Sequence, residues 1–264
     1  MNCSDATYRG SSANSPYHLL KERKAEFHRK AGQTVVRVLE AKSGVLQLIG
    51  KWDKAMKSAE KCLELAEALN NAEKKAASLN NIGNIHRARG DYAPAMEHFE
   101  KSLRIFEEIG DRPGQANSLN NIGIIHKARG DYALALEHYE KSLKIDEEIG
   151  DRPGQAKSLN NIGIIHSDRG DYAPALEHYE KSLRIFEEIG DRPGQAYRFN
   201  NIGNVHWSQG DYAPALEHYE KSLKIFEEIG DRPGQVNSLM GIGNVHYARG
   251  DYALALEHLT RSLD

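Results

Sequence analysis

The sequence predicts an all-α fold, a right-handed α-solenoid in which helix-turn-helix repeats stack into a superhelix. The first observation is a period of 40 residues, because the segment 111–150 recurs almost unchanged at 151–190 and at 191–230. The second is that apolar residues in each segment are spaced three and four apart, as on one face of a helix. The third is a Gly-Asp pair at fixed positions, which is typical of one helix ending and the next beginning. Repeats of this kind bury their apolar faces against their neighbours, so we expect no central core.

The residues that precede the repeats are predicted to form a disordered segment followed by one helix. Residues 1–15 are rich in Ser, Asn and Gly, a composition typical of disorder. Pro16 suits a first helical turn, and Gly32 is expected to end that helix, which gives it the bounds 16–32. The array then fills 33–264. Its predicted units are a degenerate repeat at 33–70, full repeats at 71–110, 111–150, 151–190 and 191–230, and an incomplete repeat at 231–264.

Each full repeat predicts two helices. In the second full repeat, Leu119 and Ile122 lie on the apolar face of the first helix, which Gly130 ends. Asp131 has the short acceptor side chain of an N-cap for the second helix, and Asp151 is placed to cap the first helix of the next repeat. The apolar stripe of the second helix consists of Ala135, Leu136, Tyr139, Leu143 and Ile145.

Composition excludes several classes of protein. The 35 basic and 38 acidic residues nearly cancel, so no strong overall field attracts nucleic acid or an anionic membrane. Cys3 and Cys62 are the two cysteines, which fits a reducing compartment better than a disulfide framework. No stretch reaches the roughly 18 apolar residues that a membrane helix requires. We therefore expect a cytoplasmic protein without a membrane partner.

The spacing of small residues carries a resemblance to a known family. The pattern reads Leu119, Ile122, Gly123 and His126 in the first helix, then Ala135, Tyr139 and Ser142 in the second. Small residues at these positions let neighbouring helices approach to about 8–10 Å. The unit resembles the tetratricopeptide repeat, with His126 where the family has tyrosine. Its length of 40 residues is similar to the repeats of the Pins/LGN polarity adaptors and of prokaryotic signalling arrays.

The hypothesis that the protein is an enzyme finds little support in the sequence. Ten of the 12 histidines are a pair that recurs in every repeat, exemplified by His126 and His138, and a packed imidazole repeated by duplication explains them. A zinc site needs ligands that converge, and none do. Glu147 and Glu148 are neighbours in sequence and do not face each other on a helix. The Gly-Asp-Arg-Pro-Gly linker lacks the strand and the Lys-Ser/Thr of a phosphate loop. We expect no enzyme activity, cofactor or metal.

The resemblance implies that the first helices line a concave groove that holds an extended peptide. Differences among the repeats concentrate on these helices: the position of Lys127 is occupied by arginine, serine, tryptophan and tyrosine in the other full repeats and in the last one. A core position could not accept that range, so these side chains meet solvent or a ligand. Neutral drift at exposed positions is the alternative. The candidate residues are Arg87, Lys127, Lys157, Tyr197, Asn204, Trp207, Asn244 and Tyr247.

Two other positions of the first helix repeat without change in the four full repeats, and the last unit departs from them with Met240 and Gly241. The first position holds Asn80, Asn120, Asn160 and Asn200, and the second holds Asn81, Asn121, Asn161 and Asn201. A carboxamide both donates and accepts, so such a row suits the N–H and C=O groups of an extended peptide. The alternative is that one asparagine per repeat bonds the neighbouring helix. We expect ligand contact above all from the second row.

The predicted function is a protein-interaction scaffold whose ligand is an extended segment, acidic where the cations lie and apolar near the aromatic residues. Two alternatives remain: a helical repeat that binds single-stranded RNA through aromatic and basic side chains, and the regulatory or sensor array of a larger signalling protein. The last repeat is unfinished. We therefore also expect an exposed surface around Ile242, Val245, Ala255 and Leu259 that packs against a second copy of the chain or against sequence that follows it.

Overall fold

The computed structural model of this chain describes residues 16–263, and the disorder predicted for residues 1–15 lies outside this range. The described residues form helices joined by short turns, without a strand. The helices are α1 (Pro16–Leu48), α2 (Trp52–Ala68), α3 (Ala72–Arg89), α4 (Tyr92–Ile109), α5 (Arg112–Ala128), α6 (Tyr132–Ile149), α7 (Arg152–Asp168), α8 (Tyr172–Glu188), α9 (Arg192–Gln209), α10 (Tyr212–Ile229), α11 (Arg232–Arg249) and α12 (Tyr252–Arg261).

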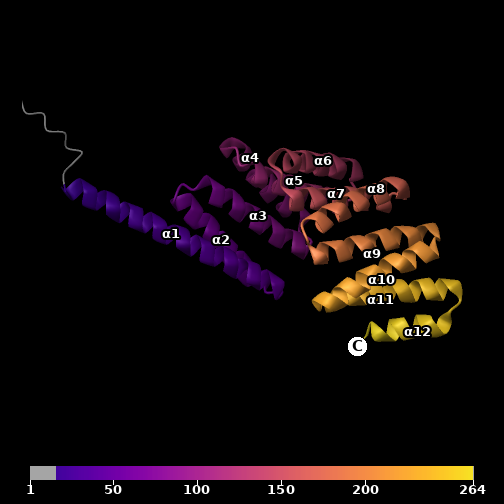
Figure 1. Cartoon of the computed structure of the whole chain (residues 1–264). Helices are drawn as coiled ribbons and strands as arrows, with labels where there is room; N and C mark the ends of the chain where they lie inside the picture. Colours follow the sequence, from indigo (N-terminus) through magenta and orange to yellow (C-terminus); the bar gives the residue numbers. More distant parts are fainter. Residues whose placement is uncertain (1–15, 264) are drawn as a thin grey trace, which may run out of the picture.

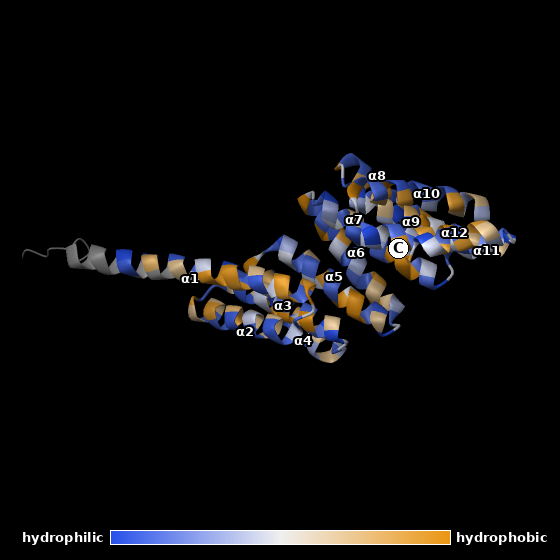
Figure 2. Cartoon of the chain, turned by 90° about the horizontal axis from the view of Figure 1, so that it is seen from below, coloured by the Kyte–Doolittle hydropathy of each residue, from blue (hydrophilic) through white to orange (hydrophobic). Residues whose placement is uncertain are grey.

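The helices stack in sequence order into an α-solenoid, which confirms the predicted fold class (Figure 1). Each helix packs on the one before it and the one after it, and α3 also contacts α5, α5 contacts α7, and α9 contacts α11. We call α3, α5, α7, α9 and α11 the first helices and their partners the second helices. Buried apolar residues gather in separate clusters between neighbouring helices, such as Ala95, Phe99, Ile122 and Ile125. Every helix carries both hydrophilic and hydrophobic residues (Figure 2).

The helix ends follow from glycine and aspartate, with one correction. Gly130 has φ 81°, a left-handed conformation that favours glycine, directly after the turn that ends α5. The Asp151 carboxylate accepts a hydrogen bond of 3.1 Å from the Gly154 amide, which confirms the predicted cap of α7. Asp131 precedes α6 as predicted, but its side chain makes no capping bond. Its Oδ2 lies 3.6 Å from Nδ1 of His126 instead, so the predicted role of this side chain was wrong.

Gly32 does not end a helix, contrary to the prediction. It lies inside α1, so the predicted helix 16–32 and the start of the degenerate repeat are one continuous element. A glycine inside a helix costs only about 1 kcal/mol relative to alanine. Here it makes room for a neighbour, because a Cβ on Gly32 would lie 3.0 Å from Cδ1 of Leu69 at the end of α2. The helix ends before Gly50, where φ is 68°.

Contacts between small and aromatic residues hold each helix pair together. A Cβ on Gly123 would lie 2.6 Å from Cε1 of Tyr139, so the tyrosine ring of α6 lies directly on the backbone of α5. Ser142 of α6 donates a hydrogen bond of 2.9 Å to the carbonyl oxygen of Ala116. The same serine bond recurs in the other full repeats, from Ser102 to Ala76, from Ser182 to Ala156 and from Ser222 to Ala196.

The second helices turn a charged face to solvent. Lys141 donates to Glu137 at 2.6 Å within α6, and Arg112 pairs with Glu148 of the same repeat. Exposed pairs of this kind contribute about 0–1 kcal/mol each.

The rings of His126 and His138 stack with their centroids 5.2 Å apart, and the equivalent rings of the other repeats stack in the same way. The histidines therefore form pairs between the two helices of a repeat.

The C-terminal expectation needs correction. Ile242, Val245 and Ala255 are buried, because α12 covers α11 as each second helix covers its partner. Leu259, the fourth residue of the predicted surface, is half-buried, so most of that surface is closed to a second copy of the chain. Exposed apolar side chains on and after α12 belong to other residues, namely Tyr252, Leu254, Leu256 and Leu263.

The close contact at Gly123 predicts that Gly123→Ala destabilises the protein. Tyr139 is buried and cannot move away, so overpacking should lower the free energy of unfolding by about 1–3 kcal/mol. Gly44→Ala is the matched control, because Gly44 also lies inside a helix and a Cβ there meets nothing within 4 Å. That variant should gain up to about 1 kcal/mol in helix propensity. Urea unfolding measures both; effects of the same sign would contradict this packing.

The repeat packing predicts that a whole unit can be removed. Deletion of 191–230 joins α8 to α11, and α8 carries the same packing residues as α10, including phenylalanine at the position of Phe226. Gly234 would then meet Phe186 as it now meets Phe226. We expect a cooperative thermal transition by circular dichroism with unchanged helix content per residue. A broad, non-cooperative transition would show that the array depends on contacts beyond neighbouring repeats.

Candidate functional site

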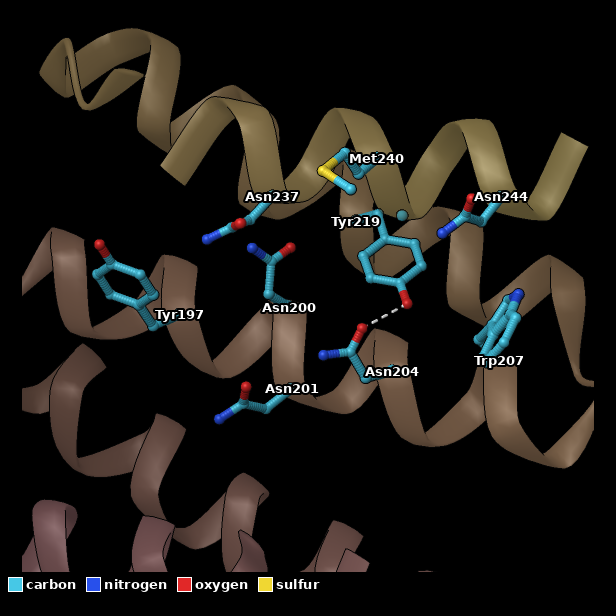
Figure 3. Close-up of a pocket in the computed structure, with 10 residues that line it drawn as sticks. Tyr197, Asn200, Asn201, Asn204, Trp207, Tyr219, Asn237, Met240 and Asn244 are labelled. Carbon is cyan, nitrogen blue, oxygen red and sulfur yellow. Dashed lines mark hydrogen bonds between the residues drawn. The ribbon is translucent and has the colours of Figure 1, made fainter. Parts of the chain in front are cut away.

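A hollow of about 330 Å³ opens between α9 and α11 and collects many of the predicted residues (Figure 3). Tyr197 and Trp207 stand at its two ends, with side chains 38% and 44% exposed. The other residues that line this aromatic hollow are Asn200, Asn201, Asn204, Tyr219, Asn237, Met240, Gly241 and Asn244.

Contacts within the aromatic hollow hold its side chains in place. The hydroxyl of Tyr219 donates a 2.7 Å hydrogen bond to Oδ1 of Asn204. Tyr197 donates to Oδ2 of Asp231 at 3.1 Å. Gly241 replaces the asparagine of the other repeats, and a Cβ there would lie 2.7 Å from the Tyr219 ring. Sequence reasoning missed Tyr219, although the exchange of asparagine for glycine at position 241 was the available signal.

A second hollow, of about 530 Å³, lies between α1, α3, α5 and α7 and brings Arg87 and Lys157 together with Asn121. Neither cation forms an ion pair with a described residue. Burial lowers the pKa of Arg87, although Tyr139 and Tyr92 raise it. Lys157 is exposed, but partial desolvation lowers its pKa; the charge of Arg87 adds to this effect, and the charges of Asp146 and Asp151 oppose it. We call this region the cationic hollow.

Two predicted residues lie apart from these hollows. Lys127 forms an ion pair of 3.2 Å with Asp168 in the next repeat, which leaves little of its charge for a ligand. Tyr247 is exposed and packs edge-on against Tyr252, with ring centroids 5.5 Å apart. The Lys127 pair joins two neighbouring repeats, whereas the Tyr247 contact lies within the last repeat.

The first asparagine row is buried and links neighbouring first helices. Oδ1 of Asn120 accepts a 2.8 Å bond from Nδ2 of Asn161, and Oδ1 of Asn160 accepts a 2.9 Å bond from Asn201. Asn80 donates to Ser118 at 3.0 Å, and Asn200 accepts from Ser238 at 3.0 Å. These bonds agree with the alternative in which an asparagine holds the adjacent helix.

The asparagines of the second row also form hydrogen bonds within the array. Besides the bonds of Asn161 and Asn201, Asn81 accepts from Gln47 at 2.7 Å and Asn121 donates to Asn117 at 3.0 Å. Atoms of this row still line hollows, since Asn121 faces the cationic hollow and Asn201 the aromatic one. Ligand contact by these asparagines stays a prediction.

Asp146 is a site residue that sequence reasoning missed. It occupies the α6 position at which the other full repeats have Phe106, Phe186 and Phe226, and it is only 3% exposed. Burial raises the pKa of its carboxyl to about 6, and the charge of Asp151 raises it further, against the bond from Ser158. A comparison of the second helices, rather than of the first helices alone, would have revealed this exception.

Stacked helix pairs with hollows between the first helices define the class of protein as an α-solenoid interaction or regulatory array. The sequence matches the family described as Tetratricopeptide repeat over residues 34–108, 110–188 and 194–264. The chain therefore belongs to the tetratricopeptide repeat family. No protein among the curated sequences matches it.

Solved structures agree with the fold. BtubC (BKLC) from P. vanneervenii is 21% identical with a TM-score of 0.71, and the match covers 80% of this chain and 89% of that one. Aspartyl phosphate phosphatase F from Bacillus subtilis is 13% identical with a TM-score of 0.69, covering 96% and 76%. A STAND signal transduction ATPase with a tetratricopeptide repeat sensor from Pyrococcus horikoshii is 17% identical with a TM-score of 0.73, covering 92% and 40%.

The described part of the chain shows neither a membrane-spanning helix nor a cluster of metal ligands. None of the helices between residues 16 and 263 is long and apolar enough to cross a membrane. In the same part of the chain, no three His, Cys, Asp or Glu side chains gather as a metal site would require.

The raised pKa of Asp146 predicts a pH-dependent effect of Asp146→Asn. The pKa of this carboxyl is about 6 in the folded protein and 3.8 in the unfolded reference state, so the folded protein keeps the proton up to a higher pH. Its ionisation therefore costs stability as pH rises through this window, by at most about 3 kcal/mol. The variant should match the wild type near pH 4 and be more stable near pH 7.5.

Urea unfolding at both pH values measures this difference, and the histidine contributions cancel because both proteins contain the same histidines. A variant that gains the same stability at both pH values would contradict the assignment.

Proposed function

We propose that this chain binds an extended segment of a partner protein along the surface formed by its first helices. The aromatic hollow between α9 and α11 carries this proposal. Tyr197 and Trp207 are large, partly exposed and separated by a row of amide side chains. Aromatic residues in such positions supply much of the free energy of binding when a partner covers them. The amides between them fit the polar backbone of an extended segment.

The cationic hollow predicts which way the bound segment runs along the array. Arg87 and Lys157 share this hollow without an anionic partner among the described residues. Desolvation lowers the pKa of Lys157 and the charge of Arg87 lowers it further, and a carboxylate bound between the two cations would offset this second effect. We therefore propose that acidic residues of the segment lie over α3 to α7 and apolar residues over α9 and α11. Charges of this kind chiefly speed association, whereas buried aromatic contacts slow dissociation.

Single-stranded RNA is the less favoured ligand. Binding to phosphates requires several free cations, and the ion pair with Asp168 removes Lys127 from that set. The net charge of −3 adds no attraction for an anionic chain. The alternative of a regulatory or sensor array concerns the consequence of binding and is compatible with the same surface.

The prediction is that Trp207→Ala releases bound peptides faster. Random peptides of about 12 residues, selected by phage display on the full chain, provide ligands of the predicted kind. Loss of a central aromatic contact should cost about 2 kcal/mol or more, which is about thirtyfold or more in dissociation rate by biolayer interferometry.

Leu134→Ala is the matched control, because Leu134 is an apolar residue of a second helix with the same exposure as Trp207, 44%. It should leave dissociation unchanged. If selected peptides respond to Leu134→Ala and not to Trp207→Ala, the second helices form the working surface. If RNA of similar length binds instead, with a steep loss between low and moderate salt, the RNA alternative is correct.

A further inference from the structure

A third hollow, of about 300 Å³, lies between α5, α6 and α7 and ends on the buried carboxyl of Asp146. Asn117, Asn120 and Lys157 lie along it, and Ser142 and Ser158 lie at its base. We call it the Asp146 pocket.

The pocket reaches Ser142 and Ser158 because one side chain is short. In the preceding repeat the equivalent hollow is lined by Phe106, and it stops short of Ser102 and Ser118, which correspond to Ser142 and Ser158. The Phe106 ring there lies directly on Gly114, whereas at Gly154 the Asp146 carboxyl takes its place. Exchange of phenylalanine for aspartate has therefore replaced an apolar ring in the lining of the hollow with a polar carboxyl.

Two buried polar groups in the pocket lack full partners. The described contacts of the Asp146 carboxylate include a long bond of 3.4 Å from Ser158, and no described cation lies within ion-pair distance. Nδ2 of Asn120, a residue only 2% exposed, has no hydrogen-bond partner among the described residues. Unpartnered groups of this kind cost free energy unless a ligand satisfies them.

We propose that the Asp146 pocket receives an arginine side chain of the partner segment, whose guanidinium donates to the Asp146 and Asp151 carboxylates. This inference rests on the proposed function and names one residue of its ligand. Pro113 and Pro153 line the pocket and offer apolar walls for the methylene stem. The planar guanidinium has several donors in a fixed fork, which suits two neighbouring carboxylates better than a single ammonium does.

The charges around the pocket agree with this occupant. Asp146 and Asp151 carry two negative charges when ionised, against one positive charge on Lys157, so one further cation neutralises the site. Arg87 in the adjoining cationic hollow attracts carboxylates. The partner segment should therefore carry a basic residue close to acidic ones, and a carbonyl oxygen of the same segment can accept from Asn120 Nδ2.

The test uses N-acetyl-arginine methylamide as the probe and the amide resonance of Gly154, at the wall of the pocket, as the readout in a 15N spectrum of the full chain. The probe should shift this resonance saturably at neutral pH. N-acetyl-citrulline methylamide has nearly the same shape without the charge and should bind at least about fivefold more weakly.

Two variants of Asp146 distinguish the effect of its negative charge from the effect of the room that its short side chain leaves in the pocket. Asp146→Asn keeps the shape and should weaken the probe at least about fivefold, and Asp146→Phe should abolish the shift while restoring the residue of the other repeats. Glu147→Gln, at an exposed neighbouring position, is the control and should bind as the wild type. Binding by the wild type should also weaken below about pH 6, since protonation of Asp146 removes its charge.

Three results would overturn the inference: no saturable shift at tens of millimolar probe, equal binding of the citrulline compound, or equal binding by Asp146→Phe. Failure of this test with intact Trp207-dependent peptide binding would remove the arginine pocket alone. Loss of peptide binding with an intact probe shift would overturn the proposed function alone.

Discussion

The structure depends on how closely two neighbouring helices can approach. The contact of the Tyr139 ring with Gly123 sets that distance within one repeat, and the bond from Ser142 to Ala116 fixes the relative rotation of the two helices. Both contacts recur along the array, so each repeat presents nearly the same surface to the next. Spacing between first helices follows from this repetition, and the hollows between them follow from the spacing.

Repeated packing also limits where the chain can vary. Positions that hold neighbouring helices cannot change without cavities or overpacking, whereas positions on the open side of the first helices can. Trp207 and Lys157 occupy such open positions and give two hollows of opposite chemical character. Asp146 is the exception, because it changes a buried position and so makes the lining of a hollow polar where the preceding repeat has an apolar ring.

The asparagine rows show how one residue type serves two purposes. Asn160 accepts a bond from Asn201 and is buried, so its amide stabilises the array. Asn201 and Asn204 also line the aromatic hollow, where exposed amide atoms can meet a peptide backbone. A ligand on this surface would therefore contact Asn201, which also links two neighbouring first helices.

The sequence by itself determined the period, the helix pairs and the small residues that let helices approach, because these are local patterns repeated along the chain. It also identified Tyr197, Trp207 and Lys157 as residues of the open surface. It could not place side chains whose partners lie a repeat away. The pairing of Lys127 with Asp168, 41 positions apart, and the pocket at Asp146 exist only once neighbouring repeats are in register. Tertiary packing decided them, because it sets which side chains meet across a repeat boundary.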